Sequence, residues 1–433
     1  MQRQSQVRVW KSEALPPDWF KRQEADEKAV QEVETSVKAI INQVKENGND
    51  ALVELAKKFD KAELTLRTLK VKKEEIKDAY NKTSPEQIRA LKFMKEKVND
   101  FQKQMLTQTE IKTSGDGVSV QTVLRPIESV GCYVPGGQAA YPSTLIMTAV
   151  PAKVAGVPRI VVCSPSDTKG KVNPLVLVAA DICGVDEIYK VGGAQAIAAL
   201  AYGTKTIKPV LKIVGPGSKY VTAAKVLVSA DVAIDMPAGP SEVLVLADES
   251  ANARFIAFDM ISQAEHGGDS VAGLITTSEK VALQVQENLA TLAASAERCE
   301  KVSEALAKYG FIVVCKNMAE AVCLVNQFAP EHLEVITSQP KEIAEKLTAG
   351  LILLGPYSPV ALSDYASGTN HVLPTGGFAQ SFSGLSVLDF MRRISIVECS
   401  RTGLERAKDT IKVMAEAENL PNHYKAIEAR FEK

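Results

Sequence analysis

The residues of this chain best suited to acid–base or metal chemistry are its four histidines, the only ones among 433 residues. Imidazole is the usual proton carrier near neutral pH and a common metal ligand. Each histidine has a carboxylate, amide or glycine among its near neighbours in the sequence. One such histidine alone would be typical of an ordinary core or surface position, but the four together indicate a shared site: His266, His332, His371 and His423.

A first group of residues has the donor atoms that zinc accepts. Gln263 and His266 stand three apart, at the end of a predicted helix that stops at a glycine pair, so both side chains share one face. Asp364 and His423 add a carboxylate and a second imidazole. Ligands spread so widely along the chain suit an open site where substrate also binds. The spacing alone is equally compatible with a helix end that carries a capping histidine.

Glu331 and His332 place a carboxylate beside an imidazole, directly after Pro330 and before an apolar segment. Adjacent residues of an extended segment point to opposite sides, so both serve one site only at a bend, which the proline favours. The pair predicts a histidine base with a glutamate that activates water or tunes the imidazole. The alternative is a surface turn with two polar residues.

Glycine-rich stretches follow several predicted strands, although Gly-x-Gly-x-x-Gly, the usual dinucleotide fingerprint, does not occur between a strand and a helix. At a strand end before a helix, backbone N–H groups and the helix dipole hold an anion or a nucleotide. Each stretch alone is compatible with a tight turn, but their succession favours a binding rim. They lie at residues 131–137, 192–195, 215–220 and 237–242.

From about residue 117 to 336, short apolar segments alternate with alanine-rich segments of helical period. This alternation predicts parallel, doubly wound α/β sheets with helices between the strands. Strands are expected at 159–163, 187–191, 212–214, 232–236, 242–247, 271–276, 311–315 and 333–336. Helices are expected at 141–155, 194–201, 279–294 and 318–328.

The two ends of the chain are charged and helical in period. Valines and isoleucines between residues 30 and 44 form one apolar stripe, and Ser84 with Gln87 predicts a capping box. The prediction is therefore a helical N-terminal arm or layer at 1–115, a first α/β domain at 116–248, a second at 249–383, and a helical tail at 384–433. The arm or the tail is expected to reach a partner subunit.

Composition excludes several classes of function. The net charge is −1 and 45% of residues are apolar, which favours a soluble globular protein and no nucleic-acid partner. The apolar runs are shorter than the roughly 20 residues that a membrane span needs, and the N-terminus lacks a signal peptide. Seven cysteines without a Cys-x-x-Cys pair indicate a reducing compartment, so the cytoplasm is expected.

Taken together, these motifs resemble the histidinol dehydrogenase family over essentially the whole chain and in the family's order. The resemblance lies in residues 131–137, 192–195, 215–220, 238–245, 262–266, 329–333, 364–375 and 418–423. It implies a homodimer with one Zn²⁺ per subunit that oxidises L-histidinol to L-histidine with two NAD⁺, the last step of histidine biosynthesis. It also implies two incomplete Rossmann-like domains, which accounts for the missing fingerprint.

The resemblance also implies a role for each residue that matches a family motif. Zinc would be held by Gln263, His266, Asp364 and the partner subunit's His423, while Glu331 and His332 would be the acid–base pair. Substrate would contact Ser241, His332, Glu418 and the zinc ligands, and NAD⁺ would contact Tyr133, Gln195 and Ser218. The family commonly has asparagine where this chain has Ser218, which puts that contact in question. His371 would have a supporting position near the substrate.

The implied mechanism has His332 take the hydroxyl proton while hydride leaves for NAD⁺, after which Glu331 activates water onto the held aldehyde for a second oxidation. Three rival functions stay open: a related dehydrogenase of another small polar alcohol, a zinc hydrolase in which Glu331 activates water, and a non-catalytic small-molecule binder. Formation of NADH from histidinol distinguishes these functions.

Overall fold

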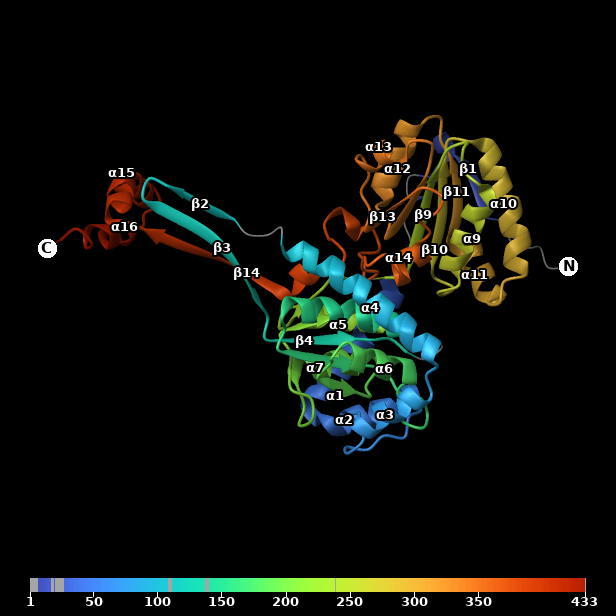
Figure 1. Ribbon diagram of the computed structural model, residues 1–433, viewed down its shortest axis with the longest axis horizontal. Coiled ribbons are helices and arrows are strands. Elements are labelled where there is room, and N and C mark those ends of the chain that lie inside the picture. The colour runs from blue at the N-terminus through green and yellow to red at the C-terminus, as the bar shows by residue number, and fades with distance from the viewer. Residues whose placement is uncertain are drawn as a thin grey trace.

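The computed structural model describes residues 7–16, 19, 27–107, 111–136, 140–237 and 239–432. It consists of two α/β bodies side by side and an arm that projects away from them to the C-terminus (Figure 1). Each body has a parallel sheet between helices, which confirms the predicted mixed α/β fold. No helix of the described residues is long and apolar enough to cross a membrane.

The first body contains a parallel sheet in the order β6-β5-β4-β7-β8. Strand β4 is buried along its whole length and β5 is buried except at Arg159, as expected of a sheet covered on both faces. The strands are β4 (Ser129–Tyr133), β5 (Arg159–Cys163), β6 (Glu187–Tyr189), β7 (Lys212–Val214) and β8 (Ala233–Ile234). The helices are α5 (Pro142–Ala155), α6 (Pro174–Ile182), α7 (Gly193–Tyr202) and α8 (Lys219–Val228).

The N-terminal helices form an outer layer on this first body. Helix α1 packs on α7 and α8, α3 packs on α6, and α4 packs on α5. The predicted stripe is the packed face of α1, where Val37, Ile41 and Val44 are buried. The capping box is confirmed, because Ser84 and Gln87 exchange hydrogen bonds at the start of α4. These elements are α1 (Glu27–Asn47), α2 (Asn49–Leu55), the π-helical turn η2 (Ala56–Asp60), α3 (Lys73–Asn81) and α4 (Pro85–Leu106).

The second body contains a parallel sheet in the order β1-β11-β10-β9-β12-β13. Its strands are β1 (Arg8–Lys11), β9 (Glu242–Ala247), β10 (Val271–Thr276), β11 (Gly310–Val314), β12 (His332–Ile336) and β13 (Leu351–Leu354). Its helices are α9 (Ala253–Ala264), α10 (Glu279–Ala294), α11 (Cys299–Tyr309), α12 (Met318–Phe328), α13 (Pro340–Ala344) and α14 (Val360–Tyr365). Short 3₁₀ turns are η1 (Ser12–Ala14), η3 (Phe378–Gln380) and η4 (Val387–Phe390).

Two strands of the second sheet come from outside the range expected for it. Strand β9 was expected to belong to the first domain, at 116–248, but it pairs with β10 and β12 at the centre of the second sheet. Strand β1, from the region expected to be helical, pairs with β11. A short apolar strand has the same local pattern in either sheet, so only long-range pairing decides which sheet it joins.

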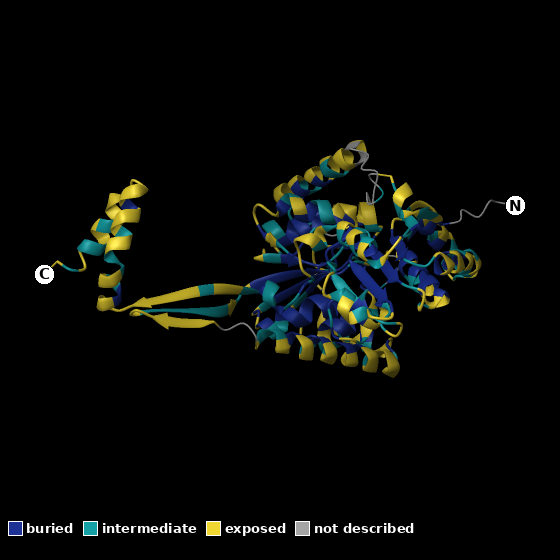
Figure 2. Cartoon of the chain, turned by 90° about the horizontal axis from the view of Figure 1, so that it is seen from above, coloured by how far each residue is buried: buried dark blue, intermediate teal, exposed yellow. Residues whose placement is uncertain are grey.

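The arm is built from a three-stranded antiparallel sheet, β14-β3-β2, with two helices at its far end. Its residues are mostly exposed in the single chain (Figure 2). The expected helical tail therefore begins with a nine-residue strand, whose charged side chains obscured its alternating pattern. The elements are β2 (Lys112–Gly115), β3 (Val118–Pro126), β14 (Met391–Cys399), α15 (Arg401–Ala417) and α16 (Pro421–Glu428).

Candidate active site

A cavity of about 850 Å³ lies between the two bodies and contains most of the residues singled out in the sequence. Loops after β4 and β7 line it from the first body. The ends of α9 and α14 and the start of β12 line it from the second. The predicted site residues that line it are Ser218, Ser241, Gln263, His266, Glu331, His332 and Asp364, and His371 also lines it.

Glu331 and His332 lie at the start of β12, where a network with Glu242 of β9 fixes both. The Glu331 carboxylate accepts a hydrogen bond from the Glu242 backbone N–H at 2.7 Å, and the Glu242 carboxylate accepts one from the Glu331 N–H at 3.2 Å. Nδ1 of His332 is 3.1 Å from the Glu242 carbonyl oxygen and 3.6 Å from the Glu331 carboxylate. Both side chains are therefore oriented by the neighbouring strand.

This geometry selects one tautomer of His332. A carbonyl oxygen only accepts hydrogen bonds, so Nδ1 must carry the proton that lies between them. Nε2 is then the basic nitrogen of the neutral ring, and it has no hydrogen-bond partner among the described residues. An imidazole held through Nδ1, with a free Nε2, has the arrangement of a general base.

The carboxylates around His332 alter its protonation. Burial by itself lowers the pKa of His332, but the charges of Glu331 and Asp364 and the hydrogen bond with Glu331 outweigh burial and raise the pKa to about 9. The ring therefore favours its protonated form in the chain alone. Positive charge added near these carboxylates would lower the pKa of His332 toward the range that a base needs.

Asp364, near the end of α14, lies among several imidazoles. Its carboxylate is 3.5 Å from Nδ1 of His371, whose Nε2 is 3.4 Å from the Thr144 hydroxyl. Burial by itself raises the pKa of Asp364, but the His371 hydrogen bond and the nearby His332 and His266 outweigh burial, so the pKa lies below its ordinary value. Asp364 is therefore a carboxylate at neutral pH, the form that binds a cation.

Three of the four residues expected to bind zinc lie in the same cavity of one chain. Gln263 is buried in the last turn of α9, and the exposed His266 follows two residues after the helix ends. These two and Asp364 offer amide, imidazole and carboxylate donors in the same cavity. Within the described residues, no group of three or more His, Cys, Asp or Glu is arranged to hold a metal ion.

The two predicted residues of the tail, Glu418 and His423, do not line this cavity. Glu418 caps the end of α15 and His423 lies in the first turn of α16. Both helices stand at the far end of the arm, away from the cavity of their own chain (Figure 1). Within a single chain, Glu418 and His423 therefore lie far from the predicted site residues that line the cavity.

The residues expected to contact a nucleotide fall into two groups. Ser218 precedes α8 and lines the cavity, and its side chain makes no capping bond to the described helix. Tyr133 and Gln195 are buried and do not line it. The Tyr133 hydroxyl accepts a hydrogen bond from the Gly193 N–H at 3.1 Å, and Nε2 of Gln195 has no partner among the described groups.

The sequence did not single out several polar residues of the site. Glu242, at the start of β9, links the site to Glu331 and also accepts a hydrogen bond from the Gly376 N–H at 2.9 Å. The Thr375 hydroxyl accepts one from the Gly239 N–H. Arg298 lines the cavity from the start of α11. The signal available in the sequence was the position of Glu242 at the start of an apolar strand, because a carboxylate is rarely placed where it becomes buried.

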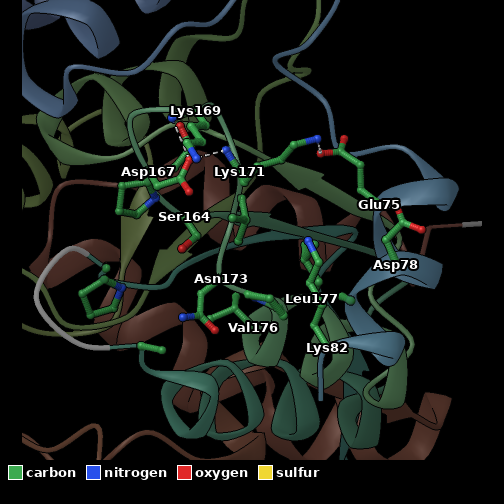
Figure 3. A pocket seen from close by; sticks show the side chains of 18 residues that line it. Glu75, Asp78, Lys82, Ser164, Asp167, Lys169, Lys171, Asn173, Val176 and Leu177 are labelled. Carbon is green, nitrogen blue, oxygen red and sulfur yellow. Dashed lines mark hydrogen bonds and ion pairs between the residues drawn. The ribbon is translucent and has the colours of Figure 1, made fainter.

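A second cavity, of about 620 Å³, adjoins the first and shares Pro135 and Gly136 with it. Ser164, Asn173 and Lys82 surround it from the loop after β5, the start of α6 and the end of α3 (Figure 3). It contains none of the residues that the sequence predicted for the site.

The fold and the cavity define a class of protein: an α/β enzyme with a buried glutamate–histidine pair in a cavity between two bodies that each contain a parallel sheet. The model of the family described as histidinol dehydrogenase matches residues 22–431. Histidinol dehydrogenase of Clostridium acetobutylicum is 47% identical over 92% of this chain and 93% of its own length. That of Methanothermobacter thermautotrophicus is 45% identical over 93% and 94%.

A solved structure has the same fold over almost the whole chain. The crystal structure of histidinol dehydrogenase from Elizabethkingia anophelis superposes with a TM-score of 0.91 at 37% identity, covering 99% of this chain and 98% of that one. The chain belongs to the histidinol dehydrogenase family, as its sequence motifs indicated. It is therefore an oxidoreductase.

Proposed function

We propose that this chain oxidises L-histidinol through the aldehyde histidinal to L-histidine, the last step of histidine biosynthesis, using one Zn²⁺ per subunit and NAD⁺. Relatives that are 45% and 47% identical carry this name over nearly their full length, which supports the reaction. The observation that carries the mechanism is the fixed Nδ1 and free Nε2 of His332 beside the Glu331 carboxylate. The seven free cysteines favour a reducing cytoplasm.

Gln263, His266 and Asp364 would hold the metal, with His423 of the partner subunit as the fourth ligand. Bound zinc would orient the substrate's nitrogen atoms and offset the carboxylate charge that keeps His332 protonated. Gln263, His266 and Asp364 line the cavity whereas His423 of the same chain does not, which supports a fourth ligand from a second subunit. The exposed arm, which carries both His423 and Glu418 away from its own body, supports a homodimer in which the tails are exchanged.

The acid–base steps follow from the positions of Glu331 and His332. Nε2 of His332 would take the hydroxyl proton of histidinol, and NAD⁺, when bound, would supply the acceptor for the hydride of the same carbon. Glu331 would then take a proton from water as the water oxygen adds to the aldehyde carbon, and the protonated His332 would return its proton to the aldehyde oxygen. The product is a gem-diol, His332 is neutral again, and Glu331 releases its proton to solvent. His332 would then take a hydroxyl proton of the gem-diol, and a second NAD⁺, when bound, would supply the acceptor for the second hydride, so that the carboxylate of histidine forms. Both oxidations thus use one base and one water-activating carboxylate.

Substrate and nucleotide would be bound by the remaining residues. Ser241 lines the cavity beside Glu331, and Glu418 of the partner subunit would contact the imidazole end of the substrate. Ser218 would contact NAD⁺ from the rim of the cleft. Tyr133 and Gln195 would also contact NAD⁺, although both are buried in the single chain. No nucleic acid or membrane partner is proposed.

The test is formation of NADH when histidinol is added to zinc-loaded protein, with and without a chelator. The proposal expects two NADH per histidinol, and loss of the signal after metal removal. Amide hydrolysis without NADH would support a zinc hydrolase, and binding without turnover would support a binding protein. Faster oxidation of another small alcohol would indicate that this alcohol is the substrate and that the reaction is still a dehydrogenation.

A further inference from the structure

A buried ion pair in the first body has no role in the mechanism above. It joins the Lys225 ammonium, on α8, to the Asp235 carboxylate, just after β8. The side chains are 3% and 0% exposed. Burying two charges costs solvation free energy that their attraction often fails to recover, so a pair of this kind is weak evidence for a stabilising role alone. Its other hydrogen bonds indicate a different role.

Both members of the pair hold the same residue, Gly215. The Lys225 ammonium donates to the Gly215 carbonyl at 3.0 Å, and the Gly215 N–H donates to the Asp235 carboxylate at 2.8 Å. The backbone donor and the backbone acceptor of one residue are thus bound by two opposite charges. Hydrogen bonds to charged groups are roughly twice as strong as neutral ones, so this residue is firmly placed.

Gly215 is held in a conformation that requires glycine. Its φ is +116°, a value that side-chain-bearing residues rarely adopt, and an added Cβ would lie 2.2 Å from the Tyr133 carbonyl oxygen. The ends of β7 and β4 are therefore in direct contact. Because the Tyr133 hydroxyl binds the Gly193 N–H, the loop after β6 is tied to the same point.

The fixed glycine sets the position of the cavity rim. Pro216, Gly217 and Ser218 follow it directly, and all three line the cavity. Ser218 in turn begins α8, the helix that carries Lys225. The Lys225 side chain on α8 thus binds Gly215, the first residue of the loop that leads into this helix. Displacement of Gly215 would move the residues that face a bound nucleotide.

We infer that Lys225 and Asp235 are positioning residues for the dinucleotide: they fix Gly215, and through it the 216–218 rim, in the conformation that accepts NAD⁺. The inference rests on the proposed use of NAD⁺. On this inference Lys225 and Asp235 affect the affinity for the nucleotide, whereas histidinol is bound by the second body and the partner subunit's arm.

Calorimetric titration of NAD⁺ into the zinc-loaded protein, together with steady-state KM values for both substrates, tests this role. Lys225→Met removes the ammonium and leaves the carboxylate unpaired. The double variant Lys225→Met/Asp235→Leu removes both charges and keeps the volume apolar, so it stays measurable if the single variant does not fold. Both are expected to weaken NAD⁺ binding by roughly tenfold or more, with the KM for histidinol within about twofold of wild type. Lys225→Arg, which keeps a donor, should recover part of the affinity.

The matched control is Arg159→Met. Arg159 also pairs with a carboxylate, Glu187 at 2.6 Å, and also donates to backbone carbonyls, but it lies at the opposite, amino end of the same sheet. It should leave the NAD⁺ affinity unchanged. Wild-type affinity in the double variant would overturn the inference, and so would equal losses for NAD⁺ and histidinol, because a merely structural pair would affect both. Absence of NAD⁺ binding in the wild type would overturn the proposed function as well.

Discussion

The half-buried Asp259 and the buried Glu334 interact electrostatically close to the candidate active site, and Asp259→Asn should change how stability depends on pH. Asp259 lies on α9, four residues before Gln263, and Glu334 lies on β12, two residues after His332. The two carboxyls are hydrogen bonded to each other, and Glu334 also accepts from the Val360 N–H at 2.9 Å, at the start of α14.

Burial raises the pKa of Asp259 to about 6, from an ordinary 3.8. Burial and the neighbouring Asp259 raise the pKa of Glu334 as well. The folded state therefore binds a proton that the unfolded state releases between about pH 4 and 6, so folding stability falls as pH rises through that window. The difference of about 2 pKa units corresponds to at most about 3 kcal/mol at neutral pH, since one unit is about 1.36 kcal/mol.

Asparagine cannot ionise, so Asp259→Asn should remove this loss. Midpoints of thermal and urea unfolding would be measured for wild type and variant at about pH 4 and about pH 7.5. Between the lower and the higher pH, the free energy of unfolding of the variant should rise by up to about 3 kcal/mol relative to that of wild type. Asp248→Asn is a control, because the pKa of Asp248 shifts in the opposite direction to that of Asp259. Although burial raises its pKa, hydrogen bonds from Ser250 and Ser338 outweigh burial and lower it. Parallel pH profiles for Asp259→Asn and wild type would refute the reasoning.

Three further predictions concern the reaction. His332→Asn should lower kcat for both histidinol and histidinal by roughly 10²- to 10⁴-fold, whereas Glu331→Gln should slow mainly the oxidation of histidinal. Single-turnover rates on the two substrates check this, and equal losses in both variants would reject the division of roles. His423→Asn should be inactive alone but should regain activity when refolded together with His332→Asn, because one site of a mixed dimer is then intact; no recovery would argue against tail exchange. A chelator should abolish NADH formation and added Zn²⁺ should restore it, which metal analysis can follow; full activity of metal-free protein would contradict a zinc requirement.

Local structure was largely predictable from sequence, because it depends on neighbouring residues. Strands β5, β7, β9 and β10 occupy the predicted residues, as does helix α12. The capping box at Ser84 follows from the hydrogen-bonding capacity of three or four consecutive residues. In each case the pattern lies within one turn or one strand.

Long-range pairing was not predictable from the same patterns. The apolar sequence of β9 is compatible with either sheet, and its place in the second one depends on contacts with β10 and β12. The arm strand β14 pairs along nine residues with β3, more than 250 positions earlier in the chain. A charged, alternating segment gives little sign of such a partner.

By itself the sequence determined the chemical groups of the site: an adjacent Glu331 and His332, an amide and an imidazole three residues apart, and glycines where the chain turns. Only the tertiary structure decided which of them meet. It brings Asp364 into one cavity with His332, and it uses the backbone of Glu242 to fix the tautomer of that imidazole. It also holds His423 away from its own cavity. The physical reason is that residue types fix donors and acceptors, whereas their distances depend on packing between segments far apart in the chain.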